Sequence, residues 1–300
     1  ANSLGSNTTA ANNTAVGKSA LGANTTGASN VAMGHAALDA NTTASNNVAV
    51  GASALTANTT GIENTALGSV SMTSCVTGNY NVAVGHQALE KCDADANIGI
   101  GREAMTELTT GQSNTGIGYL VGVYGTSLTT GGNNTMLGSL VRTSAADGAS
   151  QTVLGYNVAG QGNSTITVGE GTSDSYMSYG GTTWSTISDQ RYKKDIVDTE
   201  AGLAFINALR PVTYKWKTKG EIPVDSKHYE EGSDKTFRDD KINHGFIAQE
   251  VKAAIDEHPE IKDGFKMWNE DADGFQDIGE GYLIPMLVKS IQELSAEVEQ

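Results

Sequence analysis

The sequence predicts an all-β repeat, either a β-solenoid (β-roll) or a triple β-helix, followed by a small α+β domain that ends in a coiled-coil helix. Two observations predict this class: glycines recur at a nearly fixed step through the first half, and the composition changes abruptly near residue 187. A fixed step indicates stacked units, because one short unit cannot bury its own apolar face and must pack against its neighbours.

Ten glycines define the repeat, with steps of 17, 17, 17, 17, 16, 17, 20, 17 and 14 residues between them. They are Gly17, Gly34, Gly51, Gly68, Gly85, Gly101, Gly118, Gly138, Gly155 and Gly169. Each glycine closes a short apolar run such as Asn47-Val-Ala-Val-Gly51, and glycine allows a bend because it adopts positive φ. The pair Ala54-Leu55 suits a narrow interior, and the corner Asn58-Thr-Thr-Gly61 is typical of turns. We therefore expect parallel stacked strands over residues 1–170, with residues 171–187 as a linker.

Charge and composition separate the two halves of the chain. Residues 1–187 contain 4 of the 19 Lys and Arg residues and 10 of the 34 Asp and Glu residues, a net charge of −6. Residues 188–300 contain the other 15 and 24, a net charge of −9. Two acidic halves argue against nucleic-acid binding. No apolar run reaches the length of a membrane-spanning helix, so we expect no membrane insertion, and no signal peptide is visible.

The two cysteines, Cys75 and Cys92, lie one repeat apart and both replace the asparagine of the polar corner. On adjacent rungs they would be about 4.8 Å apart, which is within reach of a disulfide if the side chains are aimed correctly. A rung-to-rung disulfide and two stacked free thiols are the alternatives. No third ligand lies near them, so we expect no metal site, and the sequence indicates no cofactor.

Four blocks of sequence follow the repeats in a specific order. They are Ser188-Asp-Gln-Arg-Tyr-Lys193, Leu209-Arg-Pro-Val-Thr-Tyr-Lys-Trp216, His244-Gly-Phe-Ile-Ala-Gln-Glu-Val251 and Gly281-Tyr-Leu-Ile-Pro-Met-Leu-Val288. Together they resemble the C-terminal intramolecular chaperone domain of phage endosialidases, tail spikes and tail fibres. The repeat half is similar to the head repeats of trimeric autotransporter adhesins and to many phage tail fibres, in which three chains associate. The resemblance implies a chaperone auto-processing domain over residues 188–300.

The chaperone resemblance implies a self-cleaving serine endopeptidase that acts once, through a Ser-Lys dyad. Carried onto this sequence, Ser188 is the nucleophile, Lys193 is the base, and the bond between Ile187 and Ser188 is cut. Lys193 must be neutral to accept the Ser188 proton, which burial or a nearby cation such as Lys194 or Arg191 would favour.

Three further residues are candidates for supporting roles at this site: Asp189, Arg191 and His244. Arg191 could stabilise the oxyanion that forms on the Ile187 carbonyl. From spacing alone, the same stretch also fits a charged surface segment in which a Ser-Asp pair caps a helix. A histidine such as His244 is more often a packing residue than a catalytic one.

The last segment carries apolar residues at steps of 3, 4, 3 and 4 from about Gly281 onward, which is a heptad seam. The residues of this seam are Ile284, Leu287, Ile291, Leu294 and Val298. Three copies of such a helix could pack as a parallel coiled coil and hold three chains in register, which predicts a homotrimer. The alternative is a helix packed on its own domain.

These resemblances imply a distal phage tail fibre segment in the virion, assembled in the host cytoplasm. Its partners would be a bacterial surface receptor, either glycan or protein, and other tail fibre or baseplate proteins upstream. The polar surface residues His35, His86, Arg102 and Tyr119 are too scattered in the sequence to define a receptor site. A bacterial trimeric adhesin and a glycan-degrading tail spike with the same chaperone are alternatives. A spike requires paired carboxylates in a cleft, whereas the repeat half has only ten scattered acidic residues.

Overall fold

The computed structural model describes residues 2–262 and 265–299. The chain divides into two compact units, Ala1–Tyr192 and Lys193–Gln300. Each unit is described by itself, beginning with the repeat unit.

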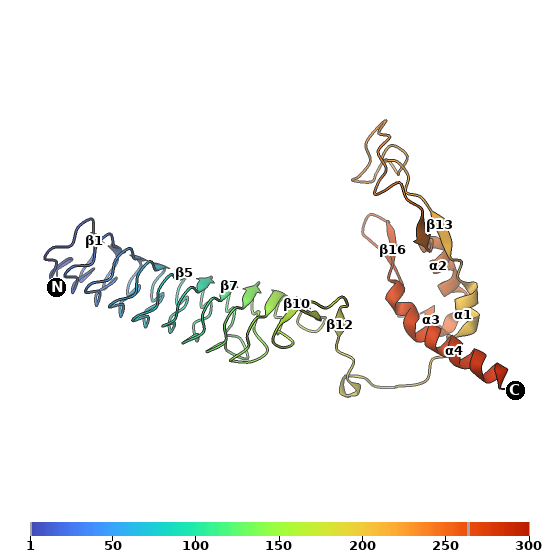
Figure 1. Cartoon of the computed structure of the whole chain (residues 1–300), viewed down its shortest axis with the longest axis horizontal. Helices are drawn as coiled ribbons and strands as arrows, with labels where there is room; N and C mark the ends of the chain where they lie inside the picture. Colours follow the sequence, from blue (N-terminus) through green and yellow to red (C-terminus); the bar gives the residue numbers. More distant parts are fainter. Residues whose placement is uncertain (1, 263–264, 300) are drawn as a thin grey trace. The chain divides into compact units, whose positions relative to one another are not determined.

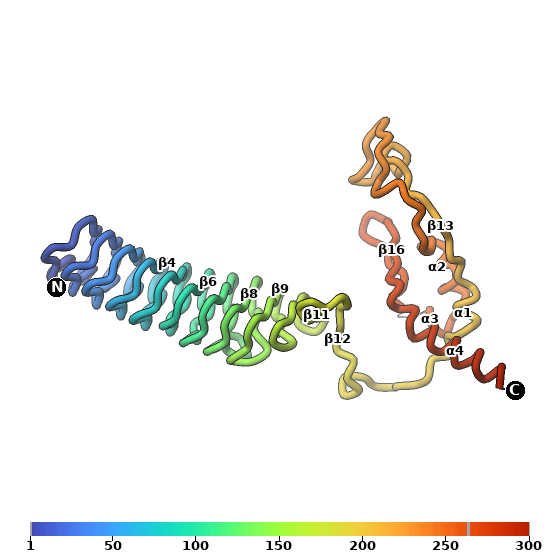
Figure 2. Tube along the Cα trace, in the orientation of Figure 1, coloured from blue at the N-terminus to red at the C-terminus, as the bar shows by residue number. Residues whose placement is uncertain are grey.

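The first unit is a β-solenoid in which each repeat contributes one short strand (Figures 1 and 2). Its parallel strands are β1 (Thr14–Val16), β2 (Val31–Met33), β3 (Val48–Val50), β4 (Thr65–Leu67), β5 (Val82–Val84), β6 (Ile98–Ile100), β7 (Thr115–Ile117), β8 (Thr135–Leu137), β9 (Thr152–Tyr156) and β10 (Thr165–Glu170). Each residue pairs with its equivalent one repeat later, as Ala15 does with Ala32. The all-β repeat is therefore confirmed.

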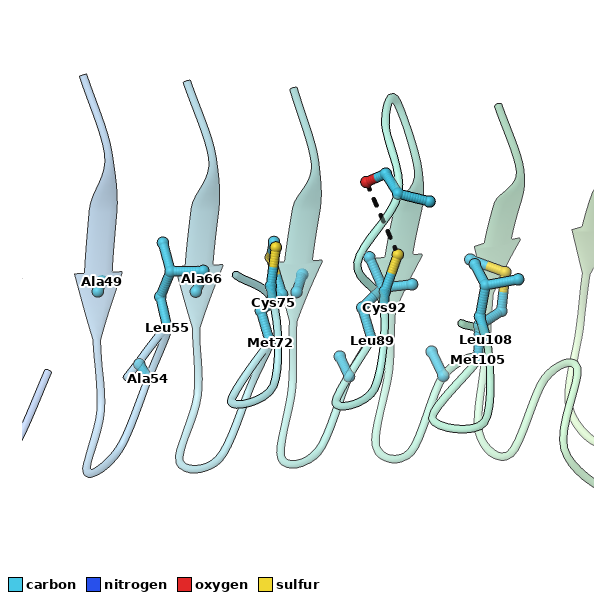
Figure 3. Close-up of a cluster of buried hydrophobic side chains, with 14 of the residues drawn as sticks. Ala49, Ala54, Leu55, Ala66, Met72, Cys75, Leu89, Cys92, Met105 and Leu108 are labelled. Carbon is cyan, nitrogen blue, oxygen red and sulfur yellow. Dashed lines mark hydrogen bonds between the residues drawn. The ribbon is translucent and has the colours of Figure 1, made fainter. Parts of the chain in front are cut away.

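The core of the solenoid is a column of small and large side chains that the repeat places at the same point of every rung. Figure 3 shows Leu55, Met72 and Leu89 inside the coil, beside alanines such as Ala49 and Ala66 of the strands. All five are fully buried. Leu55 and its equivalents have positive φ, 52° at Leu55, although the left-handed region is costly for a residue with a Cβ. Only burial against the next rung offsets this cost.

The repeat glycine is required by the approach of the next rung. At Gly68 the backbone has φ 145°, and a Cβ built there would lie 2.3 Å from the carbonyl oxygen of Gly85. Any side chain at this position would therefore collide with backbone as well as adopt a conformation that is essentially confined to glycine.

Buried asparagines satisfy the polar groups of the solenoid interior in two ladders. In the strand ladder, the Asn64 backbone N–H donates to Asn47 Oδ1 (2.9 Å), and the Asn64 side chain donates to the Gly78 carbonyl (2.8 Å). In the corner ladder, Asn58 Nδ2 donates to Asn41 Oδ1 at 3.1 Å. Because these side chains are fully buried, each unmade bond would carry a desolvation cost.

The two cysteines interrupt the corner ladder, and the disulfide considered above is not formed. Both are buried free thiols in the structure. Cys75 Sγ lies 3.7 Å from the Gly78 carbonyl oxygen and Cys92 Sγ 3.9 Å from that of Ala94, so each thiol takes up the contact of the asparagine it replaces. Burial raises the pKa of Cys75 to about 12 and of Cys92 to about 11, so both remain protonated thiols.

The one 16-residue step is compensated by a carboxylate that the sequence analysis did not identify. Asp93 Oδ1 accepts hydrogen bonds from the backbone N–H groups of Val76 (3.0 Å), Thr77 (2.7 Å) and Gly78 (3.0 Å). Burial opposes its ionisation, but the three N–H groups outweigh that effect and lower the pKa of Asp93. The carboxylate thus stands in for backbone acceptors that the shortened corner lacks.

The predicted linker, residues 171–187, is instead part of the sheet. After β10 the chain turns back into β11 (Ser175–Ser178) and then β12 (Ser185–Thr186), and both pair antiparallel. Antiparallel pairing needs only a short turn, whereas a further parallel strand would need another full rung. A 3₁₀ turn, η1 (Gln190–Tyr192), ends the first unit.

The second unit is the small α+β assembly that the sequence predicts, ending in a helix. Its elements are α1 (Leu203–Ala208), β13 (Val212–Tyr214), β14 (Asn243–Gly245), α2 (Ala248–Asp256), α3 (Pro259–Lys262), β15 (Trp268–Glu270), β16 (Gln276–Ile278), η2 (Glu280–Leu283) and α4 (Ile284–Val298). The strands form two antiparallel hairpins, β13–β14 and β15–β16. A small core surrounds Phe205, which contacts Phe265 and His258 edge to face.

Helix α4 packs on its own unit while leaving its heptad seam uncovered. It contacts α1 through a different face: Ser290 is buried, and Glu293 Oε2 accepts the Leu203 N–H at 2.7 Å. The seam residues are 43–87 % exposed in the single chain. The two alternatives in the sequence analysis are therefore not exclusive, because packing on the domain and the seam use different faces.

Candidate functional site

The segment around the predicted scissile bond is an exposed connection between β12 and η1. Ile187 and Ser188 follow β12 and are both exposed, Ile187 to 52 %. Lys193, also exposed, is the first residue of the second unit, whereas Ser188 belongs to the end of the first. The backbone at the predicted bond is thus accessible in a single chain.

The structure brings Asp189 and Arg191 together. The Asp189 carboxylate accepts the Arg191 backbone N–H (2.9 Å) and two guanidinium contacts, Nε at 3.0 Å and Nη2 at 2.6 Å. The Arg191 hydrogen bonds lower the pKa of Asp189, so this carboxylate stays ionised and is a poor proton acceptor. The pair holds the η1 turn directly after Ser188, which is a positioning role.

A lysine that acts as a base must be neutral, and burial is what favours the neutral form. The single chain does not bury Lys193. Apolar side chains that could exclude water flank the segment on either side, but they are exposed as well: Tyr192 to 75 % and Ile196 to 60 %. Lys193 and the apolar side chains beside it are therefore all exposed in the single chain.

His244 lies in β14 opposite Thr213 of β13. It lines an open cavity of about 510 Å³ together with Pro211, Phe246 and Glu280. This places it in the second unit, on a hairpin that also carries two of the sequence blocks.

Two features of the second unit were not identified from the sequence. Arg210 and Glu250 form an ion pair, with Arg210 Nε 2.9 Å from Glu250 Oε2, and this pair joins the second and third sequence blocks. An aromatic pair of the second unit, Trp216 and Phe237, is covered by Arg238, whose Cζ lies 4.7 Å from the Trp216 ring centroid. Opposite charges in two separate blocks were the signal that could have revealed the ion pair.

Within residues 2–262 and 265–299, no group of three or more His, Cys, Asp or Glu side chains is arranged to hold a metal ion. In the same part of the chain, no helix is both long and apolar enough to cross a membrane.

Comparison with known families gives one match, most of which lies in the second unit. Residues 188–258 match the family model described as chaperone of endosialidase, whose model name is that of a peptidase family, S74. The match begins at Ser188, the residue directly after the predicted scissile bond, and ends before helix α4. No curated protein and no solved structure matches the chain.

Proposed function

We propose that the chain is a fibre or spike segment with a C-terminal intramolecular chaperone, because residues 188–258 match the chaperone-of-endosialidase family model and follow a β-solenoid. We propose that three chains assemble through this domain, that the domain then cuts itself free between Ile187 and Ser188, and that the released solenoid attaches a phage tail to a bacterial surface. The proposal that the chain is cut between Ile187 and Ser188 is supported by the family match, which begins at Ser188. This residue lies on the exposed connection after β12.

The cleavage step assigns one role to each member of the dyad. Lys193 Nζ, neutral when covered, takes the proton of Ser188 Oγ as Oγ bonds to the carbonyl carbon of Ile187. The resulting oxyanion collapses, the carbon–nitrogen bond to Ser188 breaks, and the amine keeps a proton from Lys193. Water then hydrolyses the ester on Oγ. The Asp189–Arg191 pair sets the turn that presents Ser188.

Two uncovered apolar surfaces support a homotrimer. The α4 seam is one, and an apolar heptad seam is stable in water only when it packs against another helix. The outward-facing third residues of the solenoid strands are the other. Exposed members of this strand stripe are Val16, Met33, Leu67, Ile117, Leu137 and Val168. Contiguous exposed apolar surface of this kind marks an interaction site.

Denaturing gel electrophoresis and mass analysis of the full chain test the cleavage. The wild type should give two fragments that divide between Ile187 and Ser188, whereas Ser188→Ala and Lys193→Ala should remain a single band. Lys241→Ala is the matched control, because it removes an exposed lysine of the second unit that has no assigned role in cleavage, and this variant should still be cut. An intact wild-type chain that is trimeric would contradict the peptidase role and leave the chaperone role.

A further inference from the structure

The surface residues that are scattered in the sequence form one column on the solenoid. The residue after each repeat glycine lies at the same corner of every rung, just beyond the strand. The backbone ladder sets the register: Glu103 N–H donates to the His86 carbonyl (2.8 Å), Leu120 N–H to that of Arg102 (3.1 Å), Leu140 N–H to that of Tyr119 (2.9 Å) and Asn157 N–H to that of Ser139 (2.9 Å). His86, Arg102, Tyr119, Ser139 and Tyr156 are therefore neighbours, one per rung. This corrects the expectation that they define no site.

The column carries contacts that orient its polar and aromatic groups. The Arg102 guanidinium carbon lies 5.8 Å from the centroid of the Tyr119 ring, and Arg102 Nη2 lies 2.7 Å from Glu103 Oε1. Tyr119 and Tyr156 are 45 % and 54 % exposed, and the Arg102 side chain is 62 % exposed. The result is two open aromatic faces beside a fixed set of hydrogen-bond donors and acceptors.

The chemistry is local to the later rungs. Earlier in the same column stand Lys18, His35, Ala52 and Ser69, none of which is a tyrosine or an arginine. The rung that begins at Gly118 has the longest step, 20 residues, and its extra loop presents Tyr124 against Arg142, whose Cζ lies 5.7 Å from the Tyr124 ring centroid. Aromatic and guanidinium groups thus gather around β6–β9.

These groups suit a neutral sugar chain better than a charged ligand. The apolar face of a sugar ring packs on an aromatic face, while its hydroxyls use both donors and acceptors, which the Arg102–Glu103 pair supplies. A polyanion would meet Glu103 and a unit of net charge −6. Tyr119 and Tyr156 lie two rungs apart, about 10 Å, so each can pack on a different sugar of one linear chain.

We infer that the column of His86, Arg102, Tyr119 and Tyr156 binds a linear neutral glycan laid along the solenoid axis. This assignment rests on the proposed attachment to bacterial surfaces and names its ligand class and binding site. Tyr119 and Tyr156 hold the sugar rings, and Ser139 lies on the rung between them. Arg102 with Glu103 binds sugar hydroxyls on the rung before Tyr119, and His86 extends the polar part of the column by one more rung.

The test uses the self-processed full chain on an array of purified neutral and uronic-acid-containing bacterial polysaccharides, alongside binding of the labelled protein to a panel of bacterial strains. We expect retention on neutral polysaccharides. Tyr119→Ala and Tyr156→Ala should each weaken it about tenfold, as truncation of an aromatic anchor does. Arg102→Ala should weaken it less. Tyr80→Ala is the matched control, because Tyr80 is equally exposed (53 %) but lies at another corner of the rung.

The outcomes separate this inference from the attachment role itself. Binding to cells that Tyr119→Ala and Tyr156→Ala leave unchanged would overturn the column and keep attachment. If the protein binds only the polysaccharides that contain uronic acid, or binds no polysaccharide on the array, the assignment of a neutral glycan is overturned. Absence of cell binding together with tyrosine-dependent retention on neutral polysaccharides would contradict attachment while supporting the site. Unchanged circular dichroism of each variant shows that a loss is not due to misfolding.

Discussion

The two units of this chain differ in how they cover their apolar side chains. Each solenoid rung is covered by the next rung of the same chain, so the leucine column, the strand alanines and the asparagine ladders are fully buried in a single copy. The second unit has a small core around Phe205 and leaves a whole helix face, the α4 seam, in contact with solvent. A repeat can supply its own partner surface along its axis, whereas the small second unit leaves apolar surface that its own chain does not cover.

The difference also bears on folding. A leucine at positive φ costs about 1–2 kcal/mol. Burial of its side chain, which occurs only when the next rung stacks on it, contributes about 1.5–3 kcal/mol of stability. A rung that is not stacked therefore bears the conformational cost without the stabilisation by burial. Stacking in turn can occur one repeat out of step, because successive rungs are nearly identical. A second unit that brings three chains together first would fix the register, which is the physical reason for a chaperone at this end.

The largest effect is expected from a side chain at a repeat glycine. Gly68→Ala should destabilise the solenoid by on the order of 3–5 kcal/mol, because the added Cβ is both left-handed and in collision with backbone. Gly162→Ala is the matched control: its φ is similar, 142°, but nothing lies within 4 Å of the added atom. Denaturant unfolding monitored by circular dichroism measures both. If both variants lose the same free energy of unfolding, the positive φ alone, and not contact with the next rung, explains why the repeat needs glycine at this position.

A charge in the α4 seam should break assembly without unfolding the chain. In the uncut Ser188→Ala background, Leu287→Asp should convert trimer to monomer, since a buried, unpaired carboxylate is incompatible with a heptad seam. Val288→Asp changes a neighbouring residue of similar exposure outside the seam and should remain trimeric. Light scattering after size-exclusion chromatography gives the mass of each. A trimeric Leu287→Asp protein would exclude the seam as the assembly surface.

The smallest effect is expected at the interrupted asparagine ladder, and it would be stabilising. Among the described residues nothing donates to Asn58 Oδ1, because Cys75 occupies the place of the next asparagine. Cys75→Asn should supply that donor and raise the free energy of unfolding by about 1 kcal/mol. Cys92→Asn does not reach Asn58 and should give no such gain. Loss of stability in Cys75→Asn would mean that the corner is shaped for the thiol.

The sequence predicted the rungs because their requirements repeat. Gly68 and Leu55 each recur at one step, and a step is visible in a single sequence. The heptad of α4 was visible for the same reason. Asp93, the Arg210–Glu250 pair and the antiparallel strands β11 and β12 were not predicted, since each depends on contacts that occur only once.

What the sequence by itself determined is therefore the periodic part: strand, glycine bend, buried leucine and polar corner. It also contains the three blocks within residues 188–258 that match the chaperone-of-endosialidase family. Tertiary structure alone decided that both thiols remain free and that α4 packs through a face beside its seam. It also decided that His86, Arg102 and Tyr119 share one corner on consecutive rungs. The physical reason is that a repeat fixes which residues are equivalent, whereas the stacking of rungs fixes which equivalent residues become neighbours.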